Sequence, residues 1–520
     1  MELTTRGRYA VMAMADLARQ DSAVALPLSQ IAERQKLPLP YLEQLFLGLR
    51  RAGLVESARG RSGGYRLGRS AALISVADVM TAVEEETHFT RCHEEASGCI
   101  AGERCITHGL WQGLSEVTSG YLKSVTLADV AVSSKPVGAV APGARVPVQR
   151  SYLDYNATAP LKAEARAAML AALDIVGNAS SVHSEGRRAR GIVETAREQV
   201  AALVNAKPSE IVFTSGATEA NVWAMAQGFD TIFAAGIEHD SILAPARANG
   251  ARVIEIATGR EGVVRAEDVA RQILSRMDLG HVLITLQLAN NETGVLQPVS
   301  ALADFAREHG AVMHTDAVQA AGRIPIDFAA LGVTTLSLSA HKMGGPKGIG
   351  ALVIRDRIDL SSLIRGGGQE RRRRAGTENI AAIAGFGAAA VAAAKDLAEA
   401  GRIAALRDRF EDNVRAISPG AIIIGAGALR LANTSTLALP GKAAENLVIK
   451  LDLAGVAVSA GSACSSGKVG ASHVLTAMGL EPEIARSAIR VSFGPMSTEN
   501  DIAAFLAAWK TIAGQPALAA

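Results

Sequence analysis

Cysteine is scarce in this sequence, and its scarcity limits what the chain can be. Only 4 cysteines occur among 520 residues. Three of them, Cys92, Cys99 and Cys105, stand close together, while Cys464 stands alone. Disulfide frameworks need many paired cysteines in a small secreted domain. The distribution therefore predicts a metal centre and a separate nucleophile instead of disulfide bonds.

Long apolar runs and a strong net charge are also missing. The longest weakly polar run, residues 381–394, is too short to span a bilayer, and the first six residues lack the apolar stretch of a secretory signal. The formal net charge is +2, and 20% of the residues are charged. This composition is typical of a soluble globular protein and indicates no particular partner. We therefore expect a cytoplasmic protein without membrane contact.

The chain is longer than a single hydrophobic core usually grows, so we expect more than one domain. Residues 133–149 read SSKPVGAVAPGARVPVQ, which is rich in proline and glycine and has no periodic apolar face. We predict a domain over residues 1–132, a linker over 133–150 and a second domain over 151–516. The first is expected to be mainly α-helical, and the second to be α/β with a largely parallel sheet.

The first domain has the spacing of a helix-turn-helix. A helix over residues 29–35 is followed by a short turn and by a second helix that Pro40 can begin. Apolar residues recur at helical spacing on one face of the second helix. Helix-turn-helix patterns are common by chance, so a solvated basic surface stays an alternative. The apolar face comprises Leu42, Leu45, Phe46 and Leu49, and the polar face carries Glu43, Gln44 and Arg50.

A glycine-rich segment after this helix predicts a hairpin. Residues 59–65 read RGRSGGY and carry Arg59 and Arg61, which can enter a minor groove of DNA. Further on, Cys92, Cys99, Cys105 and His108 form a three-thiol and one-imidazole set. Such ligands suit zinc or an iron–sulfur cluster, and the spacing does not choose between them; unliganded thiols are the third alternative.

After His108, Leu110, Leu114, Val117 and Tyr121 repeat at four-three-four spacing. An apolar seam of this kind on a helix suits dimerisation.

The segments LTTRGRYAVMAMADLA, LPYLEQLFLGLRRAGLV and RGRSGGYRLG, together with the three cysteines and the histidine, resemble the IscR-like iron–sulfur cluster regulators over roughly residues 1–131. The resemblance implies a homodimeric winged helix-turn-helix that binds promoter DNA. It also implies a [2Fe-2S] cluster held by Cys92, Cys99, Cys105 and His108. The residues expected at DNA are Tyr41, Glu43, Gln44, Arg50, Arg59 and Arg61.

The second domain contains a lysine at the end of an expected strand. Residues 335–340 alternate in the manner of a strand and lead into His341, Lys342 and a glycine-rich segment. A lysine placed there can form a Schiff base, although a surface lysine on a loop has the same local pattern. Small residues at 214–218 open a helix that can hold a phosphate. Asp316 can pair with a pyridinium nitrogen, and His239 can stack on the ring.

Four further segments of this chain read YLDYNAT, NNETG, RRRRAGTEN and SACSSG. Together with the segments above, they resemble the NifS/IscS cysteine desulfurases over about 365 residues. The resemblance implies the type I pyridoxal-phosphate aminotransferase-like fold and an obligate homodimer. Lys342 matches the Schiff-base lysine, and His239 the acid/base residue. Asn178 and Arg490 match the residues that bind the carboxylate of L-cysteine, although Ala179 stands where the family has proline. The implied cofactor contacts are Ala217, Thr218, His239, Asn291, Asp316, Gln319, Ser339, His341, Lys342 and, from the partner subunit, Thr377.

Cys464 lies among serines and glycines, which favours a reactive thiol on a loop over a packed apolar cysteine. The resemblance implies that its thiolate takes sulfur from L-cysteine, releases L-alanine and delivers the persulfide to a scaffold-type acceptor for iron–sulfur cluster assembly. Two alternatives stay open: a transcription regulator whose pyridoxal domain only senses a ligand, and a selenocysteine lyase.

Overall fold

The computed structural model describes residues 4–19, 25–58, 63–84, 108–132, 150–461 and 471–513, with only the backbone at some positions of 108–132, among them His108. The chain divides into two units, Met1–Val148 and Gln149–Ala520. Each unit has a hydrophobic core of its own.

The first unit is a winged helix-turn-helix. Lys36, in the left-handed conformation with φ 54°, ends α2 and turns the chain into α3. Two antiparallel strands follow, with Val55 opposite Leu67 and Ala58 opposite Gly64. The elements are α1 (Thr5–Ala18), α2 (Leu28–Gln35), α3 (Leu39–Arg51), β1 (Val55–Ala58), β2 (Gly64–Leu67), η1 (Ala71–Leu73), α4 (Val76–Ala82), α5 (His108–Ser124) and α6 (Leu127–Val132).

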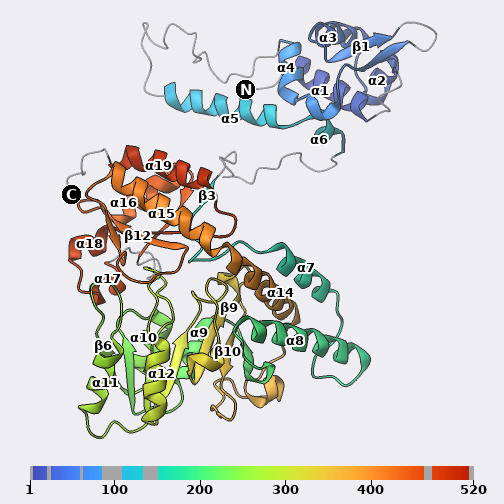
Figure 1. The fold of residues 1–520 in the computed structure, drawn as a ribbon. Coiled ribbons are helices and arrows are strands. Elements are labelled where there is room, and N and C mark those ends of the chain that lie inside the picture. The colour runs from blue at the N-terminus through green and yellow to red at the C-terminus, as the bar shows by residue number, and fades with distance from the viewer. Residues whose placement is uncertain are drawn as a thin grey trace. The chain divides into compact units, whose positions relative to one another are not determined.

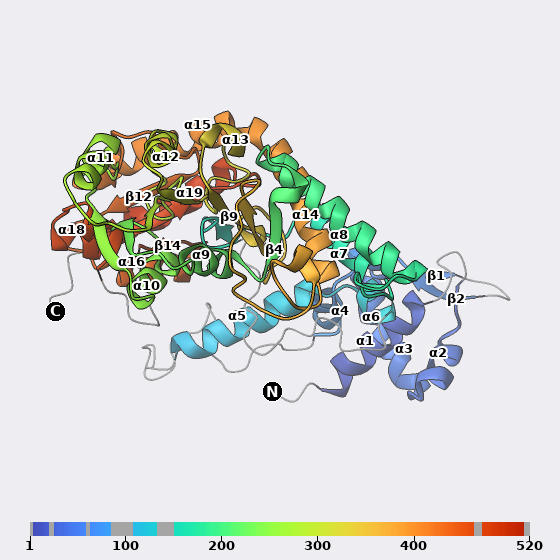
Figure 2. The same ribbon diagram turned by 90° about the horizontal axis from the view of Figure 1, so that it is seen from below.

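Helix α3 buries the face that the sequence predicts. Its four periodic apolar residues belong to the core of the unit, whereas Glu43, Gln44 and Arg50 are exposed. The helix begins at Leu39, before Pro40, because proline is tolerated anywhere in the first turn. Helix α5 projects from the other helices of its unit (Figure 2) and leaves Leu114 and Val117 exposed.

The second unit is built on a seven-stranded mixed sheet in the order β4-β10-β9-β8-β7-β5-β6. Strand β10 is antiparallel to both neighbours, and the remaining pairs are parallel. The predicted largely parallel α/β sheet is thereby confirmed. The strands are β4 (Ile211–Thr214), β5 (Thr231–Ala235), β6 (Arg252–Ile256), β7 (Val282–Thr285), β8 (Val312–Asp316), β9 (Thr335–Ser339) and β10 (Gly350–Ile354).

Two apolar clusters pack against this sheet. Helix α14 lies against both α7 and α8 (Figure 1). The helices of this part are α7 (Ala163–Leu173), α8 (Ser184–Leu203), α9 (Ala217–Met225), α10 (Asp240–Ala248), α11 (Ala266–Leu274), α12 (Val299–Glu308), α13 (Phe328–Leu331) and α14 (Ile380–Asp396), with the short 3₁₀ helices η2 (Pro208–Glu210), η3 (Ala340–Lys342), η4 (Gln369–Arg372) and η5 (Leu397–Glu399).

A smaller sheet, in the order β11-β12-β15-β14, is antiparallel throughout. Its core packs against α15, α16 and α19, and β3 pairs in parallel with β13. The bounds are β3 (Ser151–Tyr152), α15 (Ala400–Ile417), β11 (Ile422–Ile424), β12 (Thr434–Ala438), α16 (Ala444–Leu453), β13 (Val456–Ala457), β14 (Ser459–Ala460), α17 (His473–Ala477), α18 (Pro482–Ser487), β15 (Ala488–Ser492) and α19 (Glu499–Ala513).

Strand β7 is cut short at its carboxyl end. Strand β7 stops at Thr285, although the N–H groups of Leu286 and Leu288 still donate to carbonyls of the β8 strand. The N–H of Gln287 instead donates to Oε1 of Glu238 at 2.5 Å. A side-chain carboxyl group therefore takes the place of the strand ladder at this position.

Within the described residues, one helical stretch, Ile380–Ile417, is long and apolar enough to cross a membrane by length and composition, with a mean hydropathy of 1.5. It runs through α14, η5 and α15, and 56% of its most apolar window is buried inside the unit. Since α14 packs between α7 and α8, the stretch has the surroundings of a core helix.

Candidate active site

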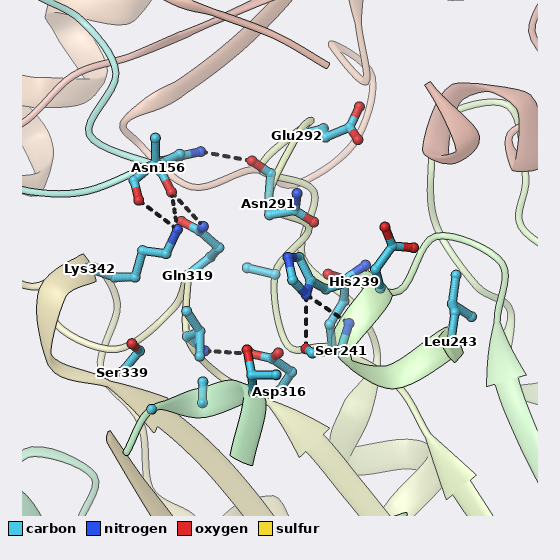
Figure 3. Close-up of a pocket in the computed structure, with 18 of the residues that line it drawn as sticks. Asn156, His239, Ser241, Leu243, Asn291, Glu292, Asp316, Gln319, Ser339 and Lys342 are labelled. Atoms are coloured by element: carbon cyan, nitrogen blue, oxygen red, sulfur yellow. Dashed lines mark hydrogen bonds between the residues drawn. The ribbon is translucent and has the colours of Figure 1, made fainter. Parts of the chain in front are cut away.

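A cavity of about 1260 Å³ opens at the carboxyl ends of β8 and β9. In open α/β sheets, ligands bind at this edge. Figure 3 shows Lys342, Gln319, Asp316, His239 and Asn291 directed around it.

Lys342 is held by two main-chain carbonyls. It follows β9 at the end of η3, and its Nζ donates to the carbonyl oxygens of Asn156 at 2.6 Å and Ala157 at 2.9 Å (Figure 3). Both acceptors belong to the chain that leaves β3. The amine therefore has a defined position at the cavity wall before any ligand enters.

Asp316 ends β8 and is held by an amide. Its Oδ2 accepts from Nδ2 of Asn221 at 2.8 Å, and its Oδ1 accepts from the N–H of Val318 at 2.9 Å. Asn221 in turn contacts Nε2 of His314 at 3.1 Å. Burial lowers the pKa of His314 to about 3, so this ring is neutral. Asp316 thus presents a carboxylate that is fixed by neutral partners.

His239 is the N-cap residue of α10, and its Nδ1 accepts from the N–H of Ser241 at 3.0 Å. Burial is the main cause that lowers its pKa. A neutral ring that accepts at Nδ1 carries its proton on Nε2. His239 therefore offers a donor nitrogen on the side of the ring away from α10.

The N-terminus of α9 forms another wall of the cavity. Its first residues, Ala217 and Thr218, line the cavity. The N-cap residue is Gly216, which has no side chain that could cap the helix. No atom lies within 4 Å of the position that a Cβ on Gly216 would occupy. A helix N-terminus with unused N–H groups favours an anion such as a phosphate.

Ser339 and His341 also line the cavity. Nδ1 of His341 lies 3.2 Å from Oγ1 of Thr158. Burial, with repulsion from Lys342 and Lys347, lowers the pKa of His341 to about 4, so its ring is neutral at pH 7.

Arg490 and Asn291 form the opposite wall. Nη1 of Arg490 donates to the carbonyl of Asn291 at 2.9 Å, and its Nη2 pairs with Oδ1 of Asp154 at 2.9 Å. Within the described part of the chain, Nε of Arg490 and Oδ1 of Asn291 are buried without a hydrogen-bond partner. Unsatisfied buried polar atoms are costly, so these two mark places where a ligand can bond.

Two buried carboxyl groups lie beside this wall. Oε2 of Glu292 accepts from Oγ of Ser472 at 2.6 Å, and burial raises the pKa of Glu292 to about 7. Burial, with Asp316 as the second cause, raises the pKa of Glu238 to about 8.

The described cavity brings together most of the residues expected at a cofactor. The exposed Asn178 does not line it, and neither does the exposed Thr377 of the same chain. Cys464 lies outside the described residues, as do Cys92, Cys99, Cys105, Arg59, Arg61 and the side chain of His108. The expected residues that line the cavity are Ala217, Thr218, His239, Asn291, Asp316, Gln319, Ser339, His341, Lys342 and Arg490.

Several residues of this site were missed by sequence reasoning. Asn156 acts through its main-chain carbonyl, which no residue type can signal, and Asn221 lies one helical turn beyond the phosphate-type segment. Asp154 and Asn156 do stand within the YLDYNAT segment that carried the family resemblance. The side chain of Asp154 was therefore an available signal, whereas the carbonyl of Asn156 had none.

The residues also fit pyridoxal phosphate. The cavity has a lysine amine held at its wall, a carboxylate at one strand end, an open helix N-terminus and two unsatisfied polar atoms. These are the groups that a phosphorylated pyridine aldehyde requires: an amine for its aldehyde, an anion for its ring nitrogen and N–H donors for its phosphate.

Comparisons with known proteins agree with this geometry. Residues 151–505 match the aminotransferase class-V family, and residues 3–133 match Rrf2, which is described as an iron-dependent transcriptional regulator. Cysteine desulfurase IscS of Dictyoglomus turgidum is 39% identical over 363 residues, which span 68% of this chain and 91% of that protein. A cysteine desulfurase of Cereibacter sphaeroides is 41% identical over 367 residues, spanning 68% and 93%.

The X-ray structure of a NifS-like protein from Rickettsia africae has a TM-score of 0.65 and 34% identity, and covers 70% of this chain and 99% of that one. The predicted winged helix-turn-helix and type I pyridoxal-phosphate fold are both confirmed. The match spans nearly the whole length of these relatives, and pyridoxal phosphate is the cofactor of the family. The chain therefore belongs to the aminotransferase class-V family, within it to the cysteine desulfurases, and carries an Rrf2 regulator domain before the enzyme.

Proposed function

We propose that this protein converts L-cysteine to L-alanine and keeps the sulfur as a persulfide on Cys464, for delivery to a scaffold-type acceptor that assembles iron–sulfur clusters. The observation that carries the proposal is the cavity in which Lys342, Asp316 and the open N-terminus of α9 converge. The desulfurase relatives support the same chemistry.

Pyridoxal phosphate, when bound, supplies an electron sink for charge that develops at the substrate Cα. Lys342 would hold its aldehyde end, and Asp316 its ring nitrogen. The phosphate would bond to Ala217, Thr218, Ser339 and His341, and to Thr377 of the second copy in a homodimer. Asn291 and Gln319 would contact the ring substituents.

The residues of the chain then carry the remaining steps. The carboxylate of L-cysteine would bind to Arg490, whose buried Nε has no other partner among the described residues. Asn178, which the family resemblance assigns to the same carboxylate, does not line the cavity of the single chain. Nζ of Lys342 takes the proton from Cα. The Cys464 thiolate attacks Sγ of the substrate, the Cβ–Sγ bond breaks, and the sulfur stays on Cys464 as a persulfide. Cβ gains a proton, and Lys342 returns its proton to Cα, which gives alanine. His239, with its proton on Nε2, donates during this sequence.

The enzyme activity is tested by incubating the full protein with L-cysteine and a thiol reductant and measuring alanine and sulfide. We expect equal amounts of both products. Cys464→Ala should keep the visible absorbance of the cofactor and lose sulfur transfer. Cofactor absorbance without alanine would favour a domain that only senses a ligand. Turnover of selenocysteine alone, independent of Cys464, would favour a selenocysteine lyase.

For the first unit we propose a homodimeric, cluster-binding DNA regulator in the cytoplasm, with the boundaries 1–132, 133–150 and 151–516. The division of the chain between Val148 and Gln149 supports the linker. The exposed Leu114 and Val117 on α5 support a dimer helix. The exposed Glu43, Gln44 and Arg50, together with Tyr41 on α3 and with Arg59 and Arg61, would contact promoter DNA.

Cys92, Cys99, Cys105 and His108 would ligate a [2Fe-2S] cluster. Anaerobic reconstitution with iron and sulfide should give a coloured protein, and Cys92→Ala should lose the colour. A colourless protein that retains zinc would contradict the cluster.

A further inference from the structure

Arg323 follows the turn after β8 and lies behind the cavity wall. Its Nη1 donates to the main-chain carbonyl of Gln319 at 3.1 Å and, at shorter range, to Oε1 of the same residue. Its Nη2 donates to the carbonyl of Tyr155 at 3.1 Å. All three acceptors are neutral, and no carboxylate pairs with Arg323 among the residues that the structure describes.

A charged group without a counter-ion is unfavourable where it is removed from water. Burial and the charge of Arg490 lower the pKa of Arg323 to about 9, which leaves the guanidinium protonated at neutral pH. One side of the residue faces a second cavity of about 620 Å³. The chain thus keeps the charge of Arg323 at a position where an apolar side chain could pack. We therefore expect this charge to have a function in the adjacent active-site cavity.

The contact with Gln319 fixes which way its amide faces. A guanidinium has donors only, so the amide oxygen must turn toward Arg323 and the amide nitrogen must turn away. Nε2 of Gln319 then donates to the carbonyl of Asn156 at 3.0 Å. Figure 3 shows Gln319 beside Lys342, with both side chains bonded to Asn156.

The same guanidinium also supports the chain that holds Lys342. Tyr155, whose carbonyl accepts from Nη2 of Arg323, directly precedes Asn156, and the Asn156 carbonyl accepts from Lys342. Arg323 therefore reaches the lysine amine through two routes, the Gln319 amide and the Tyr155–Asn156 backbone. Both routes end at the Asn156 carbonyl, which accepts from Gln319 and from Lys342.

We propose that Arg323 is a positioning residue of the desulfurase site, which locks the Gln319 amide with its N–H side toward the cavity and strengthens it as a donor. The proposal rests on the proposed function, since it assigns Gln319 to the phenolic oxygen of the cofactor. A hydrogen bond from a cation to Oε1 polarises the amide, and hydrogen bonds in a chain strengthen one another. Only one of the two Nε2 protons is used by Asn156, so the second is directed to the ligand.

This arrangement predicts a spectroscopic effect. The negative charge of the phenolic oxygen stabilises a proton on the nitrogen that would join Lys342 to the cofactor. A stronger hydrogen-bond donor at this oxygen reduces that stabilisation. That proton therefore leaves at a lower pH while Arg323 is present. Removal of Arg323 should raise the pH midpoint of the cofactor's visible absorbance change.

The test is a pH titration of the visible absorbance of the full-length holoenzyme, as wild type and as Arg323→Met. We expect the midpoint to rise by about 0.5–1 unit, the size of one ordinary hydrogen bond, since Arg323 acts on the cofactor only through Gln319. Arg355→Met is the matched control, because Arg355 also donates to two main-chain carbonyls, those of Val333 at 2.9 Å and Phe328 at 3.2 Å, outside the cavity lining. Its midpoint should equal that of wild type.

A double-mutant comparison tests whether Arg323 acts through Gln319. Gln319→Leu alone should raise the midpoint, and adding Arg323→Met to it should shift the midpoint by less than about 0.2 units, since nothing remains to be positioned. If Arg323→Met fails to fold, Arg323→Lys provides the reading, with an intermediate shift because one ammonium replaces the two-sided fork.

An unchanged midpoint in the Arg323 variants, or a full additive shift in the Gln319→Leu background, would overturn the proposal. Wild-type protein that takes up no pyridoxal phosphate would instead refute the proposed function. The two failures are therefore distinguished by the wild-type spectrum.

Discussion

The two units of this chain hold their candidate functional residues in different surroundings. In the second unit, Lys342, Asp316 and His239 are each tied to at least one further group. Asn221 and Ser241 also link Asp316 to His239. In the first unit, Glu43, Gln44 and Arg50 lie on the exposed face of α3, whose stability comes from the opposite, apolar face.

The difference teaches where function and stability are coupled. Removing one member of a buried network leaves its partners unsatisfied, so it changes both the chemistry and the fold. Removing a side chain from an exposed helix face changes binding and leaves the fold nearly unaffected. Substitutions in the two units are therefore expected to separate by size and by kind of effect.

Lys342→Ala should have the largest effect. It removes the amine that binds the cofactor and moves the Cα proton. It also takes one donor from each of two carbonyls, of which that of Asn156 still accepts from Gln319. We expect alanine formation to fall by at least about 10³-fold. Lys342→Arg is the control, because it keeps a cation near the carbonyls but lacks the nucleophilic amine, and it should be equally inactive. If either variant kept a tenth of wild-type turnover, Lys342 would not be the acting amine.

Asn221→Leu should weaken the cofactor site without touching a reacting atom. The amide bonds to Asp316 and to Ser241, so its loss frees a carboxylate and a hydroxyl inside the network. At roughly 1–3 kcal/mol for such a loss, pyridoxal phosphate should bind about 5- to 150-fold more weakly to the apoprotein. Visible titration measures this constant. Asn249→Leu removes an amide at the C-cap of α10 that bonds to the main-chain carbonyl of Met225, the last residue of α9. It should leave the constant unchanged, and equal constants for both variants would refute the network argument.

The fold and the types of residue at the site could largely be predicted from the sequence. The hydrogen-bond partners that hold these residues in place could not. The strand end before Lys342 and the buried face of α3 follow from periodicity, which depends only on neighbouring side chains. The early end of β7 could not be predicted, since it depends on Glu238, which is distant in sequence and inserts its carboxylate into the ladder. Asn156 was missed for a similar reason, because a main-chain carbonyl has no residue signature.

Glu238 should make the stability of the second unit depend on pH. Its folded-state pKa is raised from 4.5 to about 8, so the folded state holds a proton that the unfolded state has lost. The stabilising effect is full below about pH 4.5 and is lost as the pH rises through about 8. Wild type should therefore lose roughly 1–4 kcal/mol of its free energy of unfolding over this pH range. Glu238→Gln keeps the acceptor for Gln287 and should not show this loss.

Thermal unfolding at pH 5 and pH 9 measures the effect. The unfolding midpoint of wild type should fall more between these pH values than that of Glu238→Gln. Glu308→Gln, an exposed position at the end of α12, should follow wild type. A Glu238→Gln midpoint that falls in parallel with wild type would show that the carboxyl group is ionised throughout.

The smallest effects are expected on α3, where exposure removes any cost to the fold. Arg50→Ala should weaken binding of a labelled random-sequence DNA duplex by about 2- to 10-fold and reduce the slope of log affinity against log salt by about 1, because one phosphate contact is lost. Gln44→Ala should leave the slope unchanged, since an amide releases no counterion. Desulfurase turnover and thermal stability should stay within about twofold and ~0.5 kcal/mol of wild type. Arg260→Ala, an exposed arginine of the second unit, is the matched control; if it lowered the slope as much as Arg50→Ala, the exposed face of α3 would not be where DNA binds.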